Sequence, residues 1–439
     1  MSGVRTTSCG SDMDSTTLLR RRERSFGAGA ELFYRRPIQL VRGEGAHVFD
    51  ENGRRYIDFY NNVPAVGHGN THVADAISYQ QRTLNVNSRY LHEGTVAYAE
   101  RLASLHCSRI ESFVFGCSGT EANEVAIQMA RLATGRRGIL CTNAAYHGNS
   151  DLVGRLTNAG RTEPESPDVH AFPFPDLYRP IATGCSEQQL EDTYLARIQE
   201  AIERFDASGV GLAAMLICSI FANEGLPNLP KNFMARAADM VRAAGGLVIA
   251  DEVQAGFGRT GHWWGYEATG FQPDIVTLGK PMGNGVPISA AGASRDLIER
   301  FRRRTDYFNT YASSPLQAAA GMAVLDVIER DELVGNARQV GAMLKEGLER
   351  IAANDRHLGD VRGRGLFIVV DVVTDRESRT PDPQRAAAMA DRLKDLGFLT
   401  AAAGAYKNLV KVRPPLVVSR EDAASFLEAF ETARQDICG

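Results

Sequence analysis

The fold is decided by the stretch Asp274-Ile-Val-Thr-Leu-Gly-Lys-Pro-Met-Gly-Asn-Gly285. Its apolar part, Ile275–Leu278, predicts a short buried strand, and the glycines after it permit an irregular loop. Lys280 therefore leaves a buried strand and enters that loop. Lysines are rarely buried without a reason, and desolvation lowers the pKa of an amine, so that the neutral form can add to a carbonyl. Lys280 is the first candidate for a reactive residue.

Similar apolar runs recur through the middle of the chain and alternate with helical patterns. Each run is bounded by glycine, polar or charged residues, and the runs are 113–115, 139–141, 213–218, 247–250 and 275–278. Residues 233–244 have apolar positions at helical spacing and end at Gly245-Gly246, which can supply a left-handed helix cap. This alternation predicts an α/β fold with a mostly parallel central sheet flanked by helices.

The length of the chain favours one large domain and one smaller domain. It has 439 residues, of which 44% are hydrophobic and 23% charged, as in an ordinary globular protein. A turn at Asp50-Glu-Asn-Gly53 predicts a β-hairpin near the N-terminus. Beyond about Met322 the pattern changes to a smaller α+β arrangement, with helices at 324–329, 336–353 and 386–396 and strands near 366–372 and 409–412. We expect residues 1–68 to contribute to the small domain, 69–318 to form the large ligand-binding domain and 319–439 to form the C-terminal small domain.

Composition argues against several classes of partner. The formal net charge is only -4, which gives no electrostatic footprint for nucleic acid or an anionic membrane. The seven cysteines are scattered and include no Cys-x-x-Cys pair, as expected in a reducing, cytoplasmic setting. His68 and His72 have the spacing of some metal ligands, but no glutamate stands between them, so no metal site is predicted. A small molecule is the expected partner.

Two residues that follow apolar runs are candidates for binding a planar ligand. In open parallel sheets, ligands bind outside the carboxyl ends of the strands. Asp251 follows the run 247–250 and places a carboxylate there, although it could instead cap the next turn. Tyr146 follows the run 139–141 in a place where its ring could stack on another ring.

A third candidate is the small-residue loop Gly116-Cys-Ser-Gly-Thr120, which leads from a strand into a helix. Ser118 and Glu121 have the spacing of a capping box. The start of a helix presents free backbone N–H groups and the positive end of the helix dipole, which suit a phosphate. A phosphate cradle, an aromatic ring, a carboxylate and an amine are together what pyridoxal 5'-phosphate requires.

Four blocks of the chain carry a family resemblance. They are Ser118-Gly-Thr-Glu-Ala-Asn123, Ala250-Asp-Glu-Val-Gln-Ala-Gly-Phe-Gly-Arg-Thr-Gly261, the Asp274–Gly285 stretch and Phe308-Asn-Thr310. In this order and spacing they resemble the class III aminotransferases, a branch of the fold-type I pyridoxal-phosphate enzymes, from about Pro37 to the C-terminus. The resemblance implies the fold of that family and its cofactor.

The resemblance also implies roles for individual residues. Lys280 would form the Schiff base with the cofactor and shuttle the proton, and Asp251 would pair with the pyridine nitrogen. Thr310 would reach the phosphate in the neighbouring subunit, so a homodimer with shared active sites is implied. The implied cofactor-binding residues are Ser118, Gly119, Thr120, Tyr146, Asp251, Val253, Gln254, Lys280 and Thr310.

Two segments differ from the family pattern. Where the family often has a glutamate before its glycine-rich turn, this chain has Ile217-Cys218-Ser219, with Glu224 further along. After Thr310 the chain continues Tyr311-Ala-Ser-Ser-Pro315 instead of the common Gly-Gly-Asn-Pro-like turn.

The predicted function is an aminotransferase that moves an amino group from an amine or amino acid to a keto acid such as pyruvate. The segment from Tyr60 to His68 resembles a sub-branch that also contains phospholyases, so elimination of phosphate from a phosphorylated amino alcohol such as phosphoethanolamine is the alternative. A serine hydrolase using Ser118 is the hypothesis from another class. Tyr60, Lys411 and Arg413 are the substrate-binding candidates, since lysine and arginine can hold a carboxylate or a phosphate.

Overall fold

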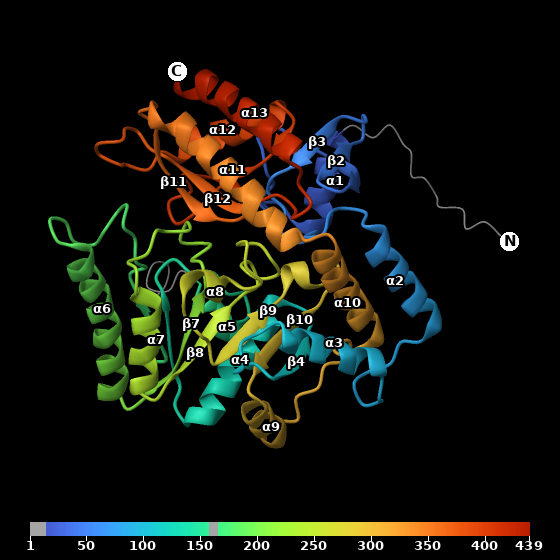
Figure 1. Ribbon diagram of the computed structural model, residues 1–439, viewed down its shortest axis with the longest axis vertical. Coiled ribbons are helices and arrows are strands. Elements are labelled where there is room, and N and C mark those ends of the chain that lie inside the picture. The colour runs from blue at the N-terminus through green and yellow to red at the C-terminus, as the bar shows by residue number, and fades with distance from the viewer. Residues whose placement is uncertain (1–14, 158–165) are drawn as a thin grey trace.

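The computed structural model describes residues 15–157 and 166–439, and a seven-stranded sheet forms its centre (Figure 1). The strand order within the described residues is β4-β10-β9-β8-β7-β5-β6. The strands are β4 Ser112–Gly116, β5 Gly138–Thr142, β6 Val169–Phe172, β7 Leu212–Cys218, β8 Leu247–Asp251, β9 Ile275–Leu278 and β10 Ser289–Ala293. Neighbours from β9 to β6 pair in parallel, whereas β10 runs antiparallel to β4 and β9. The predicted mostly parallel sheet is confirmed, and each of the five apolar runs lies in a strand.

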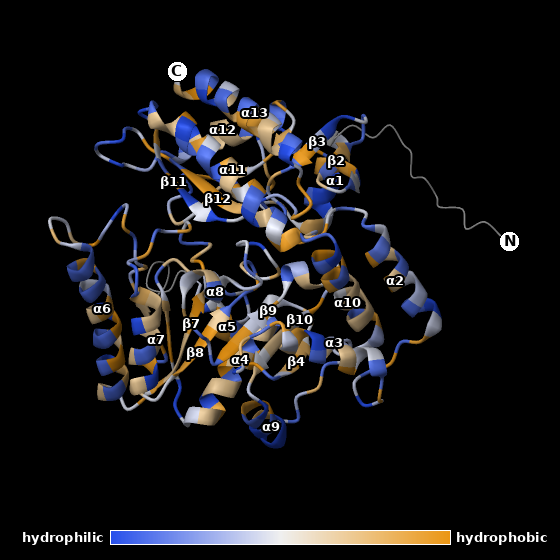
Figure 2. Cartoon of the chain, in the orientation of Figure 1, coloured by the Kyte–Doolittle hydropathy of each residue, from blue (hydrophilic) through white to orange (hydrophobic). Residues whose placement is uncertain are grey.

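Helices lie around this sheet, and their apolar sides face it. Every residue of β7 is buried, as expected for a strand covered on both faces. Figure 2 shows the apolar strands at the centre and polar surfaces on outer helices such as α6 and α9. α7 ends before Gly245, whose φ of 78° supplies the predicted left-handed turn. The helices of this part are α2 Thr71–Thr83, α3 Glu93–Ser104, α4 Gly119–Thr134, α5 Asp151–Gly154, α6 Glu187–Ala207, α7 Phe233–Ala243, α8 Gly265–Thr269, η1 Lys280–Gly283, α9 Arg295–Arg304 and α10 Pro315–Arg330.

A second α+β part stands above the central sheet in Figure 1. Its antiparallel sheet has the order β11-β12-β15-β14. The strands are β11 Leu358–Arg364, β12 Phe367–Val372, β14 Ala401–Ala403 and β15 Leu409–Val412, and the helices are α11 Leu333–Ala353, α12 Pro383–Asp395 and α13 Arg420–Cys438. The α+β arrangement predicted for this part of the chain is confirmed.

The N-terminal region joins this upper part through a third sheet, β1-β2-β3-β13. Its elements are α1 Ser15–Phe26, β1 Leu40–Glu44, β2 His47–Asp50, β3 Arg55–Asp58 and β13 Phe398–Leu399. β2 and β3 form the predicted hairpin, and β3 pairs in parallel with β13. The domain boundaries stay a prediction: α10 runs across residue 318, and residues 1–14 of the first segment lie outside the described part of the chain.

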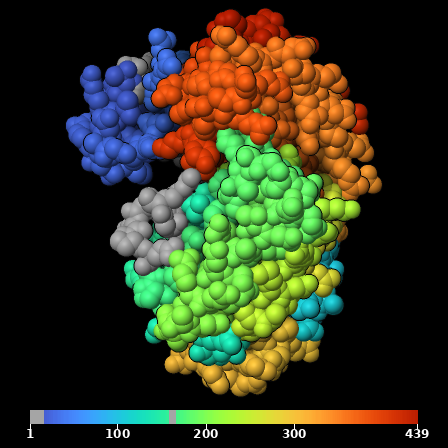
Figure 3. Space-filling view, turned by 90° about the vertical axis from the view of Figure 1, so that its left-hand side faces the viewer, coloured from blue at the N-terminus to red at the C-terminus, as the bar shows by residue number. Residues whose placement is uncertain are grey.

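Figure 3 shows the C-terminal residues, in orange and red, stacked on the large part, with the N-terminal region in blue beside them. Among the helices formed by residues 15–157 and 166–439, none combines the length and the apolar character needed to cross a bilayer.

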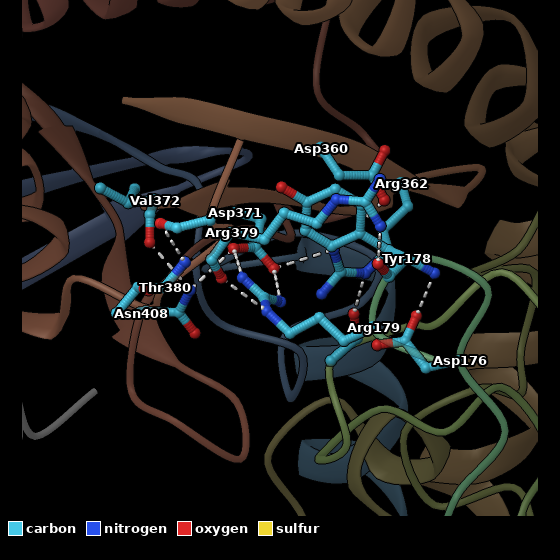
Figure 4. A network of polar contacts seen from close by, with 12 residues as sticks. Asp176, Tyr178, Arg179, Asp360, Arg362, Asp371, Val372, Arg379, Thr380 and Asn408 are labelled. Carbon is cyan, nitrogen blue, oxygen red and sulfur yellow. Dashed lines mark hydrogen bonds and ion pairs between the residues drawn. The ribbon is translucent and has the colours of Figure 1, made fainter. Parts of the chain in front are cut away.

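A buried ion-pair cluster centred on Asp371 joins the two parts (Figure 4). Arg179, from the loop after β6, donates two hydrogen bonds of 2.7 Å to the Asp371 carboxylate. Arg362 donates a third at 3.0 Å, and Asn408 donates a fourth at 2.7 Å. Arg362 also donates through Nε to the carbonyl of Gly225, in the loop after β7, at 2.8 Å. The cluster therefore connects the upper α+β part with two loops of the large part.

Replacing Asp371 by alanine should destabilise the protein strongly, because Arg179 and Arg362 would both lose the fully buried carboxylate that pairs with them. The Arg362 side chain, only 3% exposed, would keep only the partly exposed Asp360 carboxylate at 3.3 Å. Breaking a buried pair in this way costs about 3–5 kcal/mol, measurable by urea-induced unfolding. The matched control is Asp296→Ala on α9, whose exposed ion pair with Arg300 contributes at most about 0.5 kcal/mol. Equal losses in the two variants would show that the cluster does not stabilise the junction.

Candidate active site

The candidate active site is a cavity of about 120 Å³ at the carboxyl ends of the parallel strands. It brings together most of the predicted cofactor residues. A larger groove of about 750 Å³ between α11 and α13 is lined by Arg350, Glu428, Glu431 and Arg434 among others, but by no lysine. The lining residues of the smaller cavity are Gly119, Thr120, Tyr146, His147, Gly148, Cys218, Asp251, Val253, Gln254 and Lys280.

Asp251 ends β8 and is held rigidly by its neighbours. It is 5% exposed, and its Oδ1 accepts the backbone N–H of Val253 at 3.0 Å. Its Oδ2 lies 2.7 Å from Nδ1 of His147 and accepts a hydrogen bond of 3.1 Å from Nδ2 of Asn123. Oxygen Oδ1 of Asn123 in turn accepts from the Thr277 hydroxyl at 2.7 Å. The carboxylate thus has a fixed orientation at the floor of the cavity.

Lys280 begins the short 3₁₀ helix η1 directly after β9, with a φ of 23° that residues other than glycine rarely adopt. Its side chain is reached by solvent because it projects into the cavity, yet protein atoms surround it on most sides. This desolvation lowers the pKa of the amine, while the nearby Asp251 carboxylate opposes the shift. Desolvation therefore makes the neutral amine easier to reach than it is for a lysine in water.

The start of α4, where the sequence predicts an anion cradle, borders the cavity. Ser118 is the N-cap, and its hydroxyl accepts the backbone N–H of Glu121 at 3.1 Å. Gly119 and Thr120 follow in the first turn and line the cavity. The Glu121 side chain does not return to Ser118; it accepts the N–H of Cys117 at 2.7 Å and the hydroxyl of Tyr307 at 3.0 Å. The hydroxyl of Ser118 therefore serves as a helix cap in this structure.

Tyr146 and Thr310 differ in their relation to the cavity. Tyr146 lines it and is 47% exposed, so its ring is not part of the core. Thr310 is exposed and is not among the lining residues. It follows Asn309, which binds the Glu121 side chain, and therefore lies on the surface near the start of α4.

The predicted substrate residues come together on one side of the site. Arg413 donates through Nε to the carbonyl of Tyr60 at 3.0 Å and through Nη1 to Oε1 of the cavity residue Gln254 at 2.5 Å. Lys411 and Arg413 are 5% and 6% exposed. Burial, with a further contribution from Arg413, lowers the pKa of Lys411 to about 7. Neither cation forms an ion pair with any residue in the described part of the chain.

Sequence reasoning assigned no role to several residues that the structure places at the site. His147 and Asn123 both bind Asp251, and Cys218 ends β7 at the cavity wall. Glu224 is 4% exposed and contacts the hydroxyl of Thr142 through Oε1. His147 and Glu224 lie several residues beyond the ends of β5 and β7, so the only signal for them was a polar residue in a loop that follows a predicted strand.

The residues present fit pyridoxal 5'-phosphate. An added Cβ at Gly119 would lie 2.9 Å from a methyl of Val253, so glycine keeps the cradle open there. The cradle, an exposed aromatic ring, a buried carboxylate and an amine of lowered pKa border one cavity. The fold and this donor set define an enzyme of the fold-type I pyridoxal-phosphate class, and the cofactor supplies an electron sink when it is bound.

Comparisons with known proteins identify the family. Residues 33–433 match the model of the family described as aminotransferase class-III, and the chain belongs to this family. It is 36% identical over 428 residues to a Drosophila melanogaster protein named alanine--glyoxylate aminotransferase 2-like, covering 95% of this chain and 87% of that one. It is 32% identical over 431 residues to ethanolamine-phosphate phospho-lyase homolog 1 of Caenorhabditis elegans, covering 94% and 92%.

Solved structures show the same similarity in three dimensions. A phospholyase from Arthrobacter in complex with phosphoethanolamine is 41% identical, with a TM-score of 0.91 and coverage of 95% of this chain and 99% of that chain. An amine transaminase from an uncultivated Pseudomonas species in the PLP-bound form is 29% identical, with a TM-score of 0.83 and coverage of 92% and 95%. The predicted fold, family and cofactor are confirmed.

Substituting Gly119 by alanine should weaken cofactor binding, because the new Cβ would lie 2.9 and 3.0 Å from the two methyl groups of Val253. Overpacking of this kind costs about 1–3 kcal/mol, which corresponds to roughly a tenfold to hundredfold loss of cofactor affinity. The affinity is measured by titrating apoenzyme with the cofactor and following absorbance.

The second substitution Val253→Ala removes both methyl groups, and in the double variant it should restore at least part of the lost affinity. A double variant that is weaker than Gly119→Ala alone would contradict this packing account.

Proposed function

We propose that this enzyme transfers an amino group from an amine or amino acid to a keto acid such as pyruvate. The observation that carries the proposal is Arg413, a buried guanidinium without an ion-pair partner among the described residues. Buried charges are normally paired, so an anion is expected beside it. A substrate carboxylate supplies that anion, and the planar guanidinium can bind it through two parallel hydrogen bonds.

In this proposal, different residues of the chain bind the substrate, hold the cofactor and transfer the proton. Arg413 and Tyr60 orient the substrate, and Gly119 and Thr120 hold the cofactor's phosphate at the start of α4. With the cofactor bound, Tyr146 and Val253 would position its ring, Asp251 would keep the ring nitrogen protonated, and Gln254 would be the residue near the ring oxygen. Nζ of Lys280 takes a proton from the substrate carbon and returns it at another atom, which completes amino transfer.

Incubation of the holoenzyme with an amino donor and pyruvate should produce alanine, measured by chromatography. Arg413→Ala should lower the single-turnover rate constant divided by Kd for a carboxylate-bearing donor by about a hundredfold, since a buried charge contact is lost. The same constant for a primary amine without a carboxylate should change by less than about threefold. Equal losses with the two donors would contradict the role of Arg413, and absence of alanine with every donor would contradict amino transfer.

Lys411 favours a second candidate, elimination of phosphate from a phosphorylated amino alcohol such as phosphoethanolamine. Two adjacent buried cations match a phosphate dianion better than a single carboxylate. The relatives named as phospholyases, one of them in complex with phosphoethanolamine, support this candidate. Both reactions begin with the same proton removal by Lys280. In elimination the oxygen at the neighbouring carbon leaves with the phosphate, and hydrolysis then gives ammonia and an aldehyde.

Lys411→Met should lower phosphate release from phosphoethanolamine by about tenfold or more, because one charge contact to the dianion is lost. Alanine formation should change much less. Lys411 carries its charge below a pKa of about 7, so affinity for the dianion should fall as the pH rises through and above that value. In Lys411→Arg the charge persists and this fall should disappear. A pH profile identical in the wild type and Lys411→Arg would exclude titration of Lys411 as its cause.

The active form is proposed to be a homodimer with shared sites. Large apolar side chains are exposed on one surface, among them Leu91 at 101%, Tyr90 at 66% and Tyr311 at 74%. Tyr90 and Leu91 belong to one segment and Tyr311 to another. The two segments lie side by side, because the Arg89 guanidinium is 4.4 Å from the centre of the Phe308 ring. Exposed apolar patches of this kind are typical of protein interfaces. Thr310 lies in the same surface segment and would reach the neighbouring subunit's site.

A cytoplasmic location is also proposed. Six cysteines in the described residues, such as Cys107 and Cys141, form no disulfide, which fits a reducing compartment. Two relatives carry the word mitochondrial in their names, so imaging of a tagged full-length chain is the relevant test.

A further inference from the structure

The loop after β7 places a second acid beside the cofactor site. Phe221 and Leu226 have φ values of 55° and 53°, and Gly225 has a φ of 113°. Two non-glycine residues in the left-handed region are strained, and such strain persists only where the surroundings hold the backbone firmly. Glu224 lies within this loop and is 4% exposed.

Contacts from both domains hold the loop in place. On one side, Oε1 of Glu224 accepts the hydroxyl of Thr142, at the end of β5, and Nδ2 of Asn223 donates to the carbonyl of Tyr146 at 3.2 Å. On the other side, Arg362 from the cluster in Figure 4 donates to the carbonyl of Gly225 at 2.8 Å. Glu224 is therefore fixed against the segment that carries Tyr146 and His147.

Two buried polar atoms in this region have no hydrogen-bond partner among the described residues. They are Oε2 of Glu224 and Nε2 of His147. The other nitrogen of His147, Nδ1, binds Asp251 at 2.7 Å. The imidazole also lies near enough to interact electrostatically with the Glu224 carboxyl. Buried polar atoms left unsatisfied are costly, and an ordered water with partners on both sides satisfies them.

The surroundings of Glu224 favour its neutral form. Burial raises the pKa of this carboxyl above its usual range, and the hydrogen bond from the Thr142 hydroxyl offsets only part of that shift. The other titratable groups that interact with it are the Cys218 thiol and the Lys411 amine. Neither forms an ion pair with Glu224.

We propose that Glu224 is a positioning residue of the cofactor site: a neutral carboxyl that, through one ordered water, completes the hydrogen bonding of His147 and so orients Asp251. This inference rests on the proposed cofactor role of Asp251. The donors then run in one direction: Thr142 to Oε1, Oε2–H to the water, the water to Nε2, and Nδ1–H to Asp251.

The neutral form of the Glu224 carboxyl affects cofactor binding through the orientation of Asp251. An ionised Glu224 would have no proton to donate to the water, so the series of donors that ends at Asp251 would be interrupted. With Glu224 neutral, the Asp251 carboxylate stays available for the proton on the ring nitrogen. Glu224 therefore acts on the cofactor through His147, without touching it.

Infrared difference spectra of apoprotein test the protonation directly. At neutral pH, Glu224→Gln should lose one band from a protonated carboxyl relative to the wild type. The matched control is Glu191→Gln, because Glu191 is equally buried but paired with Arg236 at 2.5 Å, and it should lose no such band. A wild-type spectrum without a carboxyl band assigned to Glu224 would overturn the proposal. This result does not depend on whether the proposed reaction is correct.

Cofactor titration of apoenzyme tests the positioning role. In Glu224→Gln the amide oxygen can accept from Thr142 and the amide N–H can donate to the water, so affinity and the pH dependence of cofactor absorbance should match the wild type. Glu224→Ala should bind the cofactor about tenfold more weakly. Equal affinities for Gln and Ala, or a Gln variant as weak as Ala, would overturn the role of Glu224. Failure of the wild type to bind the cofactor would instead contradict the proposed function.

Discussion

The parallel pairing of β8 with β9 is the constraint on which the site depends. In this register Asp251 lies opposite Thr277, so the acid at the end of β8 and the loop after β9 open at the same edge of the sheet. Lys280 lies three residues after Thr277 in the sequence, and its side chain lines the same cavity as Asp251. Both strands lie in the core, and a shift in register would turn buried side chains to the opposite face. The sheet therefore fixes the relation between acid and amine.

The buried charged side chains differ in whether the protein supplies them with partners. Asp251 is stabilised by three hydrogen bonds from the protein, and Asp371 by two arginines and an asparagine. Lys411 and Arg413 are buried as well, but no residue in the described part of the chain supplies a counter-charge to either of them. Under the proposed function, a substrate anion supplies the counter-charge that Lys411 and Arg413 do not have among the described residues.

Sequence alone was sufficient for features that follow from chain order near a strand. Lys280 and Asp251 directly follow apolar runs, and Ser118 precedes a helical pattern, so their places could be predicted from sequence. β10 was missed because Ser-Ala-Ala-Gly-Ala lacks the β-branched residues that indicate a strand. The contact between Arg413 and Tyr60 joins residues 353 positions apart, which no local pattern encodes. His147 and Glu224 depend on the paths of two loops, and one of those paths is held by Arg362 from the small domain.

The attachment of the cofactor to Lys280 is the central claim, and one measurement tests it most directly. Lys411 is a real competitor, because its amine is also buried and has a pKa lowered to about 7. Holoenzyme reduced with borohydride and digested should carry the cofactor on the peptide that contains Lys280, as identified by mass spectrometry. Attachment at Lys411, or no attachment at all, would contradict the account.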